Sequence, residues 1–437
     1  MTPPLRINRR GFLAAGLAAA ALPRVATGAT SLPLRAEPVV AQILDPGDGA
    51  TPMLGFNGST PGPELRVAEG QRLSVAFENR LADPTAVHWH GIRIDNAMDG
   101  VPGLTQDAVP PGGGFGYDFV APDAGTYWYH SHHQSWEQVA RGLYGPLIVT
   151  ETTPPDVDRD ITVILDDWRL EQNGEMAAGF GNMHDFAHGG RMGNFAKAIL
   201  SQTTVNTGER IRLRLINTAT ARIFPVALEG IDARIVALDG RPLAQPRALG
   251  QMLLAPAQRI DVIGDVTDVV RFLFPTPEQA YEMGKLTLGA APVTAKRGPI
   301  QTLPAGHRPT PGEERALTLR MEGGAMGGRH AGDDIWAFNG TSGLRDAPFA
   351  QFALGDTARF TLINDTAFPH GIHLHGHHFY ELDATTGSQG DLRDTTLLMA
   401  GETRDILCVF DNPGKWLLHC HMLGHQASGM KTWVEVA

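Results

Sequence analysis

One short pattern occurs three times along this chain of 437 residues and limits what the chain can fold into. Each copy holds a glycine and an asparagine nine positions apart, with apolar and polar residues alternating between them, and the copies span residues 70–79, 208–217 and 355–364. Such alternation indicates a half-buried β-strand, and glycine and asparagine are typical of the turns that bound it. Three copies predict three related β domains, near residues 30–152, 153–305 and 306–437.

The composition agrees with an all-β fold made of Greek-key β-sandwiches. Glycine (51) and proline (31) are abundant, as expected where many short strands are joined by turns. Proline-rich stretches at 154–155 and 299–311 are typical of linkers and agree with the predicted domain limits. With 42% hydrophobic and 19% charged residues, the chain is too apolar and too weakly charged to be disordered.

The net charge and the cysteine count exclude several classes of protein. A formal net charge of −11 argues against nucleic acid or an anionic membrane surface as the main partner. Two cysteines exclude a disulfide framework. No apolar run reaches the roughly 18 residues that a membrane-spanning helix needs. We therefore expect a protein without a membrane span, and we expect a monomer.

The first 29 residues predict an export signal. They contain four arginines and no acidic residue, and Arg9 and Arg10 stand just before an apolar run at 12–22. This arrangement resembles the twin-arginine signal, and small residues at 26–29 offer a cleavage site. The alternative interpretation is a short N-terminal helix. Because the twin-arginine route carries folded proteins, we expect the mature protein in the periplasm.

Histidine is concentrated in pairs of the form His-x-His. Five such pairs occur among 17 histidines, and four of them lie at matched places in the first and third domains: His88/His90, His130/His132, His373/His375 and His419/His421. On a strand, residues i and i+2 point to the same face, so each pair aims two imidazoles at one point. A single ion cannot use eight converging imidazoles. The pairs therefore predict a metal cluster between the first and third domains, while the second domain has apolar residues at these places.

A second set of ligand types lies near the end of the sequence. Cys420 is followed by His425 and Met430, and His370 precedes the third histidine pair. Two imidazoles, a thiolate and a weak thioether form the ligand set of a blue-copper electron-transfer centre. Zinc is the competing metal for a cysteine and histidine set. The thioether and the large number of imidazoles favour copper.

These motifs together resemble those of the multicopper oxidases. The motifs are His88-Trp89-His90-Gly91, His130-Ser131-His132, the segment from His370 to Gly376, and the segment from His419 to Met430. The resemblance covers all three domains and implies three consecutive cupredoxin-like domains that hold four copper ions. Gly371 departs from the usual family spelling, in which proline follows the first histidine of the third motif, and we expect no effect on ligation.

The resemblance also implies a role for each ligand. The type 1 copper would take His370, Cys420, His425 and Met430, and the type 2 copper would take His88 and His373. The type 3 pair would take the remaining six histidines, which are His90, His130, His132, His375, His419 and His421. Electrons would pass from Cys420 to its neighbours His419 and His421, and four one-electron oxidations of the donor would reduce one dioxygen to two waters.

Formation of water also needs protons. Asp99 stands eleven residues after His88, where the family keeps a carboxylate beside the cluster, so Asp99 joins Cys420 as a predicted catalytic residue. The alternative is a plain turn residue before Gly100. Some bacterial members place a glutamate where this chain has Gln426, and an amide cannot carry a proton in the same way. Cys408 lies in an apolar strand and is predicted to be a buried core thiol.

Two segments bear on the electron donor. One runs from 176 to 192 and includes Met183, His184, His188 and Met192; the other runs from 321 to 330 and includes Met321, Met326 and His330. Thioethers and imidazoles bind Cu(I), and the methionines, which also include Met176, lie in glycine-rich stretches that are not expected to build a core. The alternative is that these methionines lie in loops without metal.

Three functional interpretations follow. The first is a periplasmic multicopper oxidase that acts on Cu(I) and simple phenols in copper tolerance. The second is a laccase-type enzyme for organic donors without a metal-oxidase role. The third is a non-catalytic relative that serves as a cell-division scaffold, which the complete ligand set disfavours. A copper nitrite reductase is also disfavoured because it needs no type 3 ligands.

Overall fold

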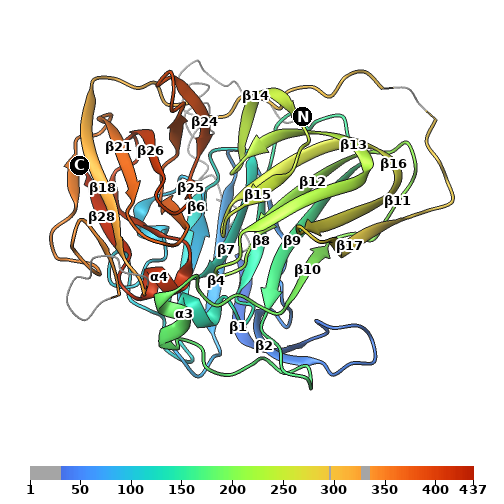
Figure 1. Ribbon diagram of the computed structural model, residues 1–437, viewed down its shortest axis with the longest axis horizontal. Coiled ribbons are helices and arrows are strands. Elements are labelled where there is room, and N and C mark those ends of the chain that lie inside the picture. The colour runs from blue at the N-terminus through green and yellow to red at the C-terminus, as the bar shows by residue number, and fades with distance from the viewer. Residues whose placement is uncertain (1–30, 295–296, 326–334) are drawn as a thin grey trace, which may run out of the picture.

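The computed structural model describes residues 31–294, 297–325 and 335–437, and these residues lie mainly in β-strands. Figure 1 shows three consecutive groups of strands, with the last (orange to red) beside the first (blue to cyan) and the middle group (green to yellow) on the other side. The helices within the described ranges are short: η2 (Asn96–Met98), α2 (Ser135–Gln138), α3 (Met183–Ala187) and α4 (Leu423–Ala427). The all-β prediction is confirmed. The predicted export signal at 1–29 lies outside the described residues.

The first unit is a sandwich of two four-stranded sheets, with the orders β2-β1-β4-β6 and β3-β8-β7-β5. Its strands are β1 (Leu32–Ala41), β2 (Thr51–Phe56), β3 (Leu65–Ala68), β4 (Arg72–Asn79), β5 (Val87–His90), β6 (Gly114–Val120), β7 (Gly125–Ser131) and β8 (Tyr144–Thr150). Residues from both sheets, among them Val75, Trp89 and Tyr129, form one buried core. The first pair of predicted ligands lies on β5, at an edge of the second sheet.

The second unit is built on one large sheet that bends around its own core. Its strands are β9 (Arg159–Trp168), β10 (Phe195–Leu200), β11 (Thr204–Val205), β12 (Arg210–Asn217), β13 (Phe224–Leu238), β14 (Arg241–Ala248), β15 (Met252–Leu254), β16 (Arg259–Pro275) and β17 (Ala280–Leu288). The long strands β13 and β16 pair with register shifts, and such bulges bend a sheet. Val226, which stands where the other units have histidine, is buried in this core.

The third unit repeats the sandwich of the first, with sheets of the order β19-β18-β21-β26-β23-β24 and β20-β28-β27-β22-β25. Its strands are β18 (Glu314–Gly323), β19 (Trp336–Phe338), β20 (Ala350–Phe352), β21 (Thr357–Asn364), β22 (His370–Leu374), β23 (Phe379–Leu382), β24 (Gln389–Arg393), β25 (Thr395–Leu398), β26 (Thr403–Val409), β27 (Gly414–Cys420) and β28 (Lys431–Val436). The adjacent strands β22 and β27 carry His370, His373, His419 and Cys420, so one antiparallel pair brings both predicted sites together.

The repeated asparagine has the same structural role in each unit. Asn79, Asn217 and Asn364 are buried at the ends of β4, β12 and β21. In each case the side-chain oxygen accepts a hydrogen bond from the backbone N–H two residues later, and the side-chain nitrogen donates to a backbone carbonyl four or five residues later, in the loop after the strand. The asparagine thus fixes the turn that leaves the strand, which explains why the pattern recurs.

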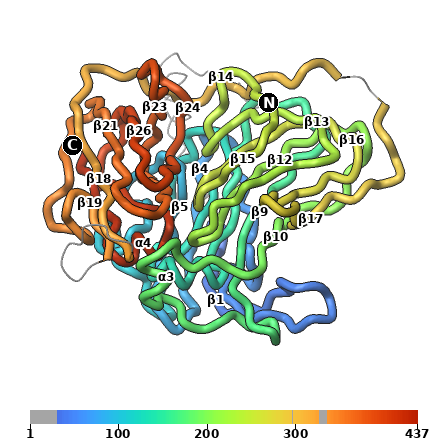
Figure 2. Tube along the Cα trace, viewed as in Figure 1, coloured from blue at the N-terminus to red at the C-terminus, as the bar shows by residue number. Residues whose placement is uncertain are grey.

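The described residues of the connection between the second and third units, which joins β17 to β18, run along the outside of the second unit (Figure 2). The described residues of this proline-rich segment have no regular secondary structure, as the sequence predicts for a linker. The exact domain limits remain a prediction.

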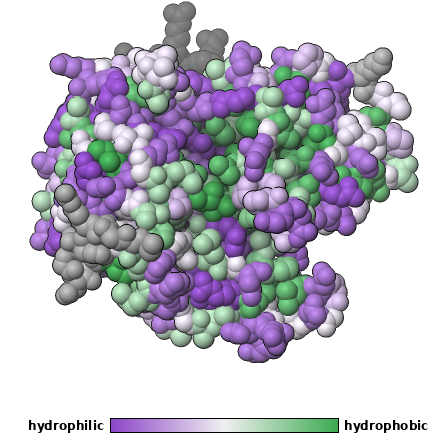
Figure 3. Space-filling view, viewed as in Figure 1, coloured by the Kyte–Doolittle hydropathy of each residue, from purple (hydrophilic) through white to green (hydrophobic). Residues whose placement is uncertain are grey.

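On the face shown in Figure 3, hydrophilic and hydrophobic residues are mixed. Within the described ranges, no helix combines the length and apolarity needed to cross a membrane.

Candidate metal centres

The four predicted histidine pairs meet between the first and third units. His88 and His90 lie on β5, and the second pair lies at the end of β7, which pairs with β5. The third and fourth pairs lie at the ends of β22 and β27. All eight side chains are buried. Imidazoles from the two units stack on each other, with ring centroids 3.9 Å apart for His88 and His375 and 3.8 Å apart for His90 and His373.

Hydrogen bonds to one ring nitrogen leave the other nitrogen free in most of these histidines. The Nδ1 atoms of His88, His130, His373 and His419 face backbone carbonyl oxygens at 2.7–2.9 Å, so Nδ1 carries the proton and Nε2 the lone pair. The buried ring nitrogens without a hydrogen-bond partner are Nε2 of His88, His130, His132 and His373, Nδ1 of His90, and both nitrogens of His421. Buried lone pairs held in this way are typical of metal ligands.

One contact in the cluster is favourable only with a cation between the two rings. The Nε2 atoms of His375 and His419 lie 3.1 Å apart. The Nδ1 atom of His375 faces the Asp99 carboxylate at 2.9 Å, and that of His419 faces a carbonyl oxygen, so both Nε2 atoms present lone pairs to each other. Two opposed lone pairs repel, whereas a bound metal ion would take both. The donor set therefore fits metal ions between the units.

Six of these histidines are also held in the neutral form that metal binding requires. Burial, together with the neighbouring imidazoles, lowers the pKa well below its usual value in these six: His90, His130, His132, His375, His419 and His421. Several overlapping groups of three ligand atoms lie within 4.8 Å of one another, including His88/His90/His130 and His132/His375/His419. Overlapping groups are suited to several ions rather than one.

Asp99 contacts histidines of both units. It follows η2, its side chain is buried, and its backbone carbonyl accepts a hydrogen bond from Nδ1 of His88 at 2.7 Å. Its carboxylate lies 3.2 Å from the same nitrogen and 2.9 Å from Nδ1 of His375. The predicted position beside the cluster is therefore found in the structure, while a role in proton transfer stays a prediction.

A second buried carboxylate, Asp394, was not identified from the sequence. Its backbone carbonyl accepts a hydrogen bond from Nδ1 of His373 at 2.8 Å, and its Oδ1 atom lies 3.3 Å from Nε2 of His90. Arg259, at the start of β16, binds the carboxylate through two hydrogen bonds. Burial alone would raise the pKa of Asp394, but the Arg259 guanidinium offsets this, so the pKa lies well below its usual value. An acid in a turn before a strand is common, and no sequence signal distinguishes this one.

The second predicted site also assembles. Cys420 Sγ lies 3.5 Å from Nδ1 of His370 and 3.8 Å from Nδ1 of His425, and these two nitrogens are 3.0 Å apart. Met430 is buried beside them, and its backbone bonds to the backbones of Cys420 and His425. Burial raises the pKa of the Cys420 thiol to about 12 and lowers that of His425 to about 4. A metal ion would therefore be needed to hold the thiolate at neutral pH.

The outer edge of this second site is covered by the segment around α3. The Nε2 atom of His425 donates to the backbone carbonyl of His188 at 2.6 Å. The His188 ring lies 4.2 Å from the ring of His184, between centroids. In the same segment, the side chains of Met183 and Met192 are 65% and 45% exposed. Soft donor atoms thus lie at the surface in the segment whose backbone is hydrogen-bonded to the predicted copper ligand His425.

The structure corrects one prediction about the methionines. Met321 lies on β18 and is fully buried in the core of the third unit, so it does not belong to a surface segment. Its place in an alternating strand directs its side chain between the two sheets. Met176 is half-buried and packs against a small apolar cluster. Met326 and His330 lie outside the described residues.

Cys408 behaves as predicted. It lies on β26, is fully buried in the core of the third unit and is not bonded to Cys420. Burial raises the pKa of its thiol well above the usual value. The cysteine is therefore a packing residue, and Cys420 is left free to bind a metal.

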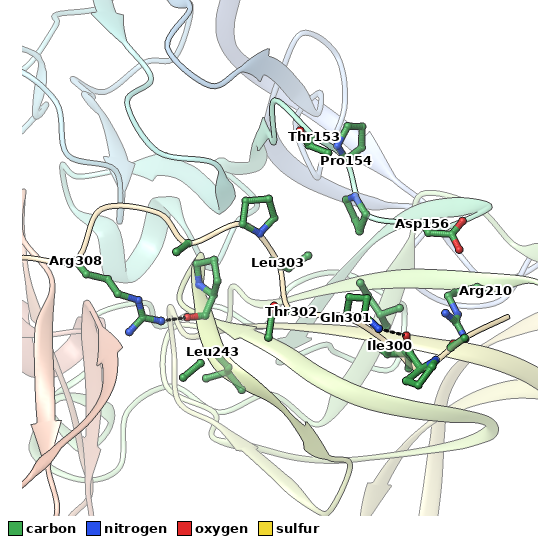
Figure 4. Close-up of a pocket in the computed structure, with 18 residues that line it drawn as sticks. Thr153, Pro154, Asp156, Arg210, Leu243, Ile300, Gln301, Thr302, Leu303 and Arg308 are labelled. Carbon is green, nitrogen blue, oxygen red and sulfur yellow. Dashed lines mark hydrogen bonds between the residues drawn. The ribbon is translucent and has the colours of Figure 1, made fainter.

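A cavity of about 950 Å³ lies away from both sites, beside the connection between the second and third units (Figure 4). Its lining includes Pro154, Arg210, Leu243, Leu303 and Arg308. None of its lining residues is a predicted ligand, and the Arg308 guanidinium binds the carbonyl of Pro242. The cavity belongs to the junction of the units and is not part of the histidine cluster.

Comparisons with known proteins agree with this geometry. Three family models, each described as multicopper oxidase, match residues 40–154, 124–274 and 315–437. The chain is 30% identical to multicopper oxidase MmcO of Mycobacterium tuberculosis, over 98% of this chain and 97% of that protein. It is 25% identical to a copper resistance protein A homologue of Pseudomonas syringae pv. tomato, over 90% of both.

Among solved structures, the chain is similar to Lac15 from a marine microbial metagenome. The two share 52% sequence identity with a TM-score of 0.82, and the match covers 93% of this chain and 100% of that one. The matched family models and these similarities confirm three consecutive cupredoxin-like units, as the motifs predicted.

Proposed function

This chain belongs to the multicopper oxidase family and is an oxygen-dependent oxidoreductase, and we propose that it oxidises Cu(I) and simple phenols in periplasmic copper tolerance. The observation that most supports this proposal is that the segment around α3 covers His425. The outer nitrogen of His425 donates to the carbonyl of His188, so that nitrogen is already hydrogen-bonded, and a donor would have to pass its electron through the segment around α3 rather than by bonding to His425. Exposed thioethers and an imidazole in that segment suit a soft metal ion.

The ligand sets implied by the family fit the free ring nitrogens. We assign His370, Cys420, His425 and Met430 to a type 1 copper, and His88 and His373 to a type 2 copper. The six remaining histidines are assigned to a type 3 pair: His90, His130, His132, His375, His419 and His421. When bound, these four coppers would accept single electrons from the donor and pass four of them to dioxygen, which yields two waters.

The residues of the chain position this chemistry. His419 and His421 flank Cys420 in sequence, so a short covalent path joins the two sites. The carbonyl groups and the two buried carboxylates fix which ring nitrogen faces the metal in six of the histidines: His88, His90, His130, His373, His375 and His419. Asp99, in hydrogen-bond contact with His88 and His375, is the proposed source of protons for water formation.

Two further points of the proposal come from the sequence and the relatives. The paired arginines before a short apolar run support export by the twin-arginine route to the periplasm. One relative carries the name copper resistance protein A homologue, which supports a role in copper tolerance. The second candidate remains a laccase-type oxidase for organic donors. It is favoured if the segment around α3 moves away from His425.

The test compares two donors in the same preparation. Met183 and Met192 are replaced by serine, and oxygen uptake of the copper-loaded protein is measured with Cu(I) and with dimethoxyphenol. We expect Cu(I) oxidation to fall about tenfold, equivalent to about 1.4 kcal/mol, with little change for the phenol. Met399→Ser is the matched control, since Met399 is 50% exposed and lies on the loop after β25.

Either of two results would contradict the cuprous role. Unchanged Cu(I) oxidation would favour the laccase-type candidate. An equal loss of both activities, also seen in the control, would show that the exposed methionines act only on stability. Met321 is left out of this test because its replacement would disturb the core.

A further inference from the structure

The second unit carries none of the predicted ligands, yet one of its residues reaches the histidine cluster. Arg259 is fully buried at the start of β16. Its Nε donates to the carbonyl of Thr126 in the first unit at 3.0 Å, and one Nη atom donates to the carbonyl of Ala257 in its own unit at 3.1 Å. Both Nη atoms donate to the carboxylate of Asp394 in the third unit, at 2.9 and 2.6 Å. One side chain thus joins all three units.

Asp394 in turn contacts two histidines of the cluster that belong to different units. Its carbonyl accepts from His373, and its carboxylate lies 3.3 Å from His90. The rings of His90 and His373 are stacked with centroids 3.8 Å apart. The carboxylate plane is fixed by the paired hydrogen bonds of the guanidinium, because a planar fork matches a carboxylate in one orientation.

The first histidine motif ends in a glycine that leaves space for the ion pair between Arg259 and Asp394. Gly91 directly follows His90 and has a positive φ of 85°. A Cβ atom at this position would overlap both the Arg259 guanidinium and the Asp394 carboxylate. The glycine therefore lets the pair approach the backbone beside His90, and a side chain there would push it away.

We propose that Arg259 is a positioning residue for the metal cluster, which acts through Asp394 to orient His90 and His373 across the boundary between the first and third units. The inference rests on the proposed ligand assignment. It gives the second unit a direct part in the cluster. The two buried acids then differ in role. In the hydrogen bonds and ion pairs described above, the Asp99 carboxylate contacts histidines only. The Asp394 carboxylate is held in place by the Arg259 guanidinium.

The test removes the guanidinium and measures metal binding rather than turnover alone. In Arg259→Gln, we expect the copper of the cluster to be lost to a competing chelator about tenfold more readily, and the type 2 signal in electron paramagnetic resonance to change. The blue band of the type 1 site should persist, because Arg259 does not contact that site. Arg259→Lys should restore part of the copper retention, since it keeps the charge but not the fork.

Arg212→Gln is the matched control. Arg212 is equally buried on the neighbouring strand β12 and pairs with Asp261 and Glu151, but it contacts none of the predicted ligands. We expect it to lower the unfolding temperature without changing copper retention or the type 2 signal. If Arg212→Gln changes that signal to the same extent, the effect of Arg259 is one of general stability and the proposal is overturned.

A double variant tests the route through Asp394. If Arg259 acts through that carboxylate, Arg259→Gln combined with Asp394→Asn should retain copper no worse than Asp394→Asn alone. Additive losses would overturn the route. The copper content of the unmodified protein distinguishes a wrong ligand assignment from a wrong role for Arg259. Fewer than four coppers there would contradict the proposed ligand assignment, whereas four coppers in both the unmodified protein and Arg259→Gln, with identical spectra, would contradict only the role of Arg259.

Discussion

Replacing Asp99 by asparagine should slow the reaction with dioxygen while leaving the oxidation of the donor fast. The backbone carbonyl that holds His88 at 2.7 Å is unchanged, and the amide oxygen can still accept from Nδ1 of His375, now 2.9 Å from the carboxylate. The ligands should therefore keep their orientation. What is lost is the group able to give up and take back a proton. Such a group typically accelerates a reaction by a factor of about 10²–10⁴.

We take the lower end of that range because the hydrogen bonds to the ligands are retained. A loss of about 100-fold corresponds to about 2.7 kcal/mol of activation free energy. The assay is stopped-flow absorption: the reduced enzyme is mixed with dioxygen, and the return of the oxidised spectrum is followed. In a second experiment, oxidised enzyme is mixed with donor without oxygen, and its rate should stay the same.

A second buried carboxylate provides the matched control for the reoxidation experiment. Asp123→Asn removes another buried carboxylate of the first unit, which pairs with Arg93 and Arg241 and is hydrogen-bonded to none of the predicted ligands, and it should leave reoxidation unchanged. If Asp99→Asn reoxidises at the original rate with full copper content, the proton role is refuted. If it loses copper instead, Asp99 is a positioning residue.

Three other predictions follow from the same geometry. Cys420→Ser should abolish the blue band and the oxidase activity together, with fewer than four coppers by elemental analysis; a surviving blue band would contradict the type 1 assignment. Met321→Ala should lower the free energy of unfolding by about 2–5 kcal/mol in denaturant titration, whereas Met183→Ala at the surface should change it by less than about 0.5 kcal/mol. In the metal-free protein, the folded pKa of His425 is about 4, below the unfolded value of about 6.5. The unfolded chain binds more protons between these values, so stability should be full above pH 6.5 and fall by up to about 3 kcal/mol from this residue as the pH drops towards 4. Denaturant titrations at pH 7 and pH 5 check this, and equal stability at both would contradict it.

The strands and the converging ligands could be predicted from local patterns. Alternation marks a half-buried strand, and a residue spacing of two places both histidines of a pair on one face. The matched positions of the four pairs in the repeated first and third units then predicted that the pairs meet between these units. The glycine and asparagine of each repeat act within a few residues of themselves, so their role is visible in the sequence.

The contacts that were missed join residues far apart in the chain. Arg259 and Asp394 are separated by 135 positions, and the hydrogen bond from His425 to His188 spans 237. An arginine at a strand start and an acid in a turn look like solvated residues when each is considered alone. Met321 was misjudged for a related reason, since its glycine-rich neighbours suggested a loop although β18 extends through it.

The order of the histidines along the chain has a consequence for biosynthesis. The ribosome makes His88, His90, His130 and His132 more than 240 residues before it makes His373, and the last pair comes later still. A first unit that folds early would present bare imidazole nitrogens with nothing stacked against them. Such a half-site would be open to whichever metal the cell offers. Copper added before the last strands have folded would therefore meet an incomplete coordination shell, and loading is best delayed until synthesis is finished.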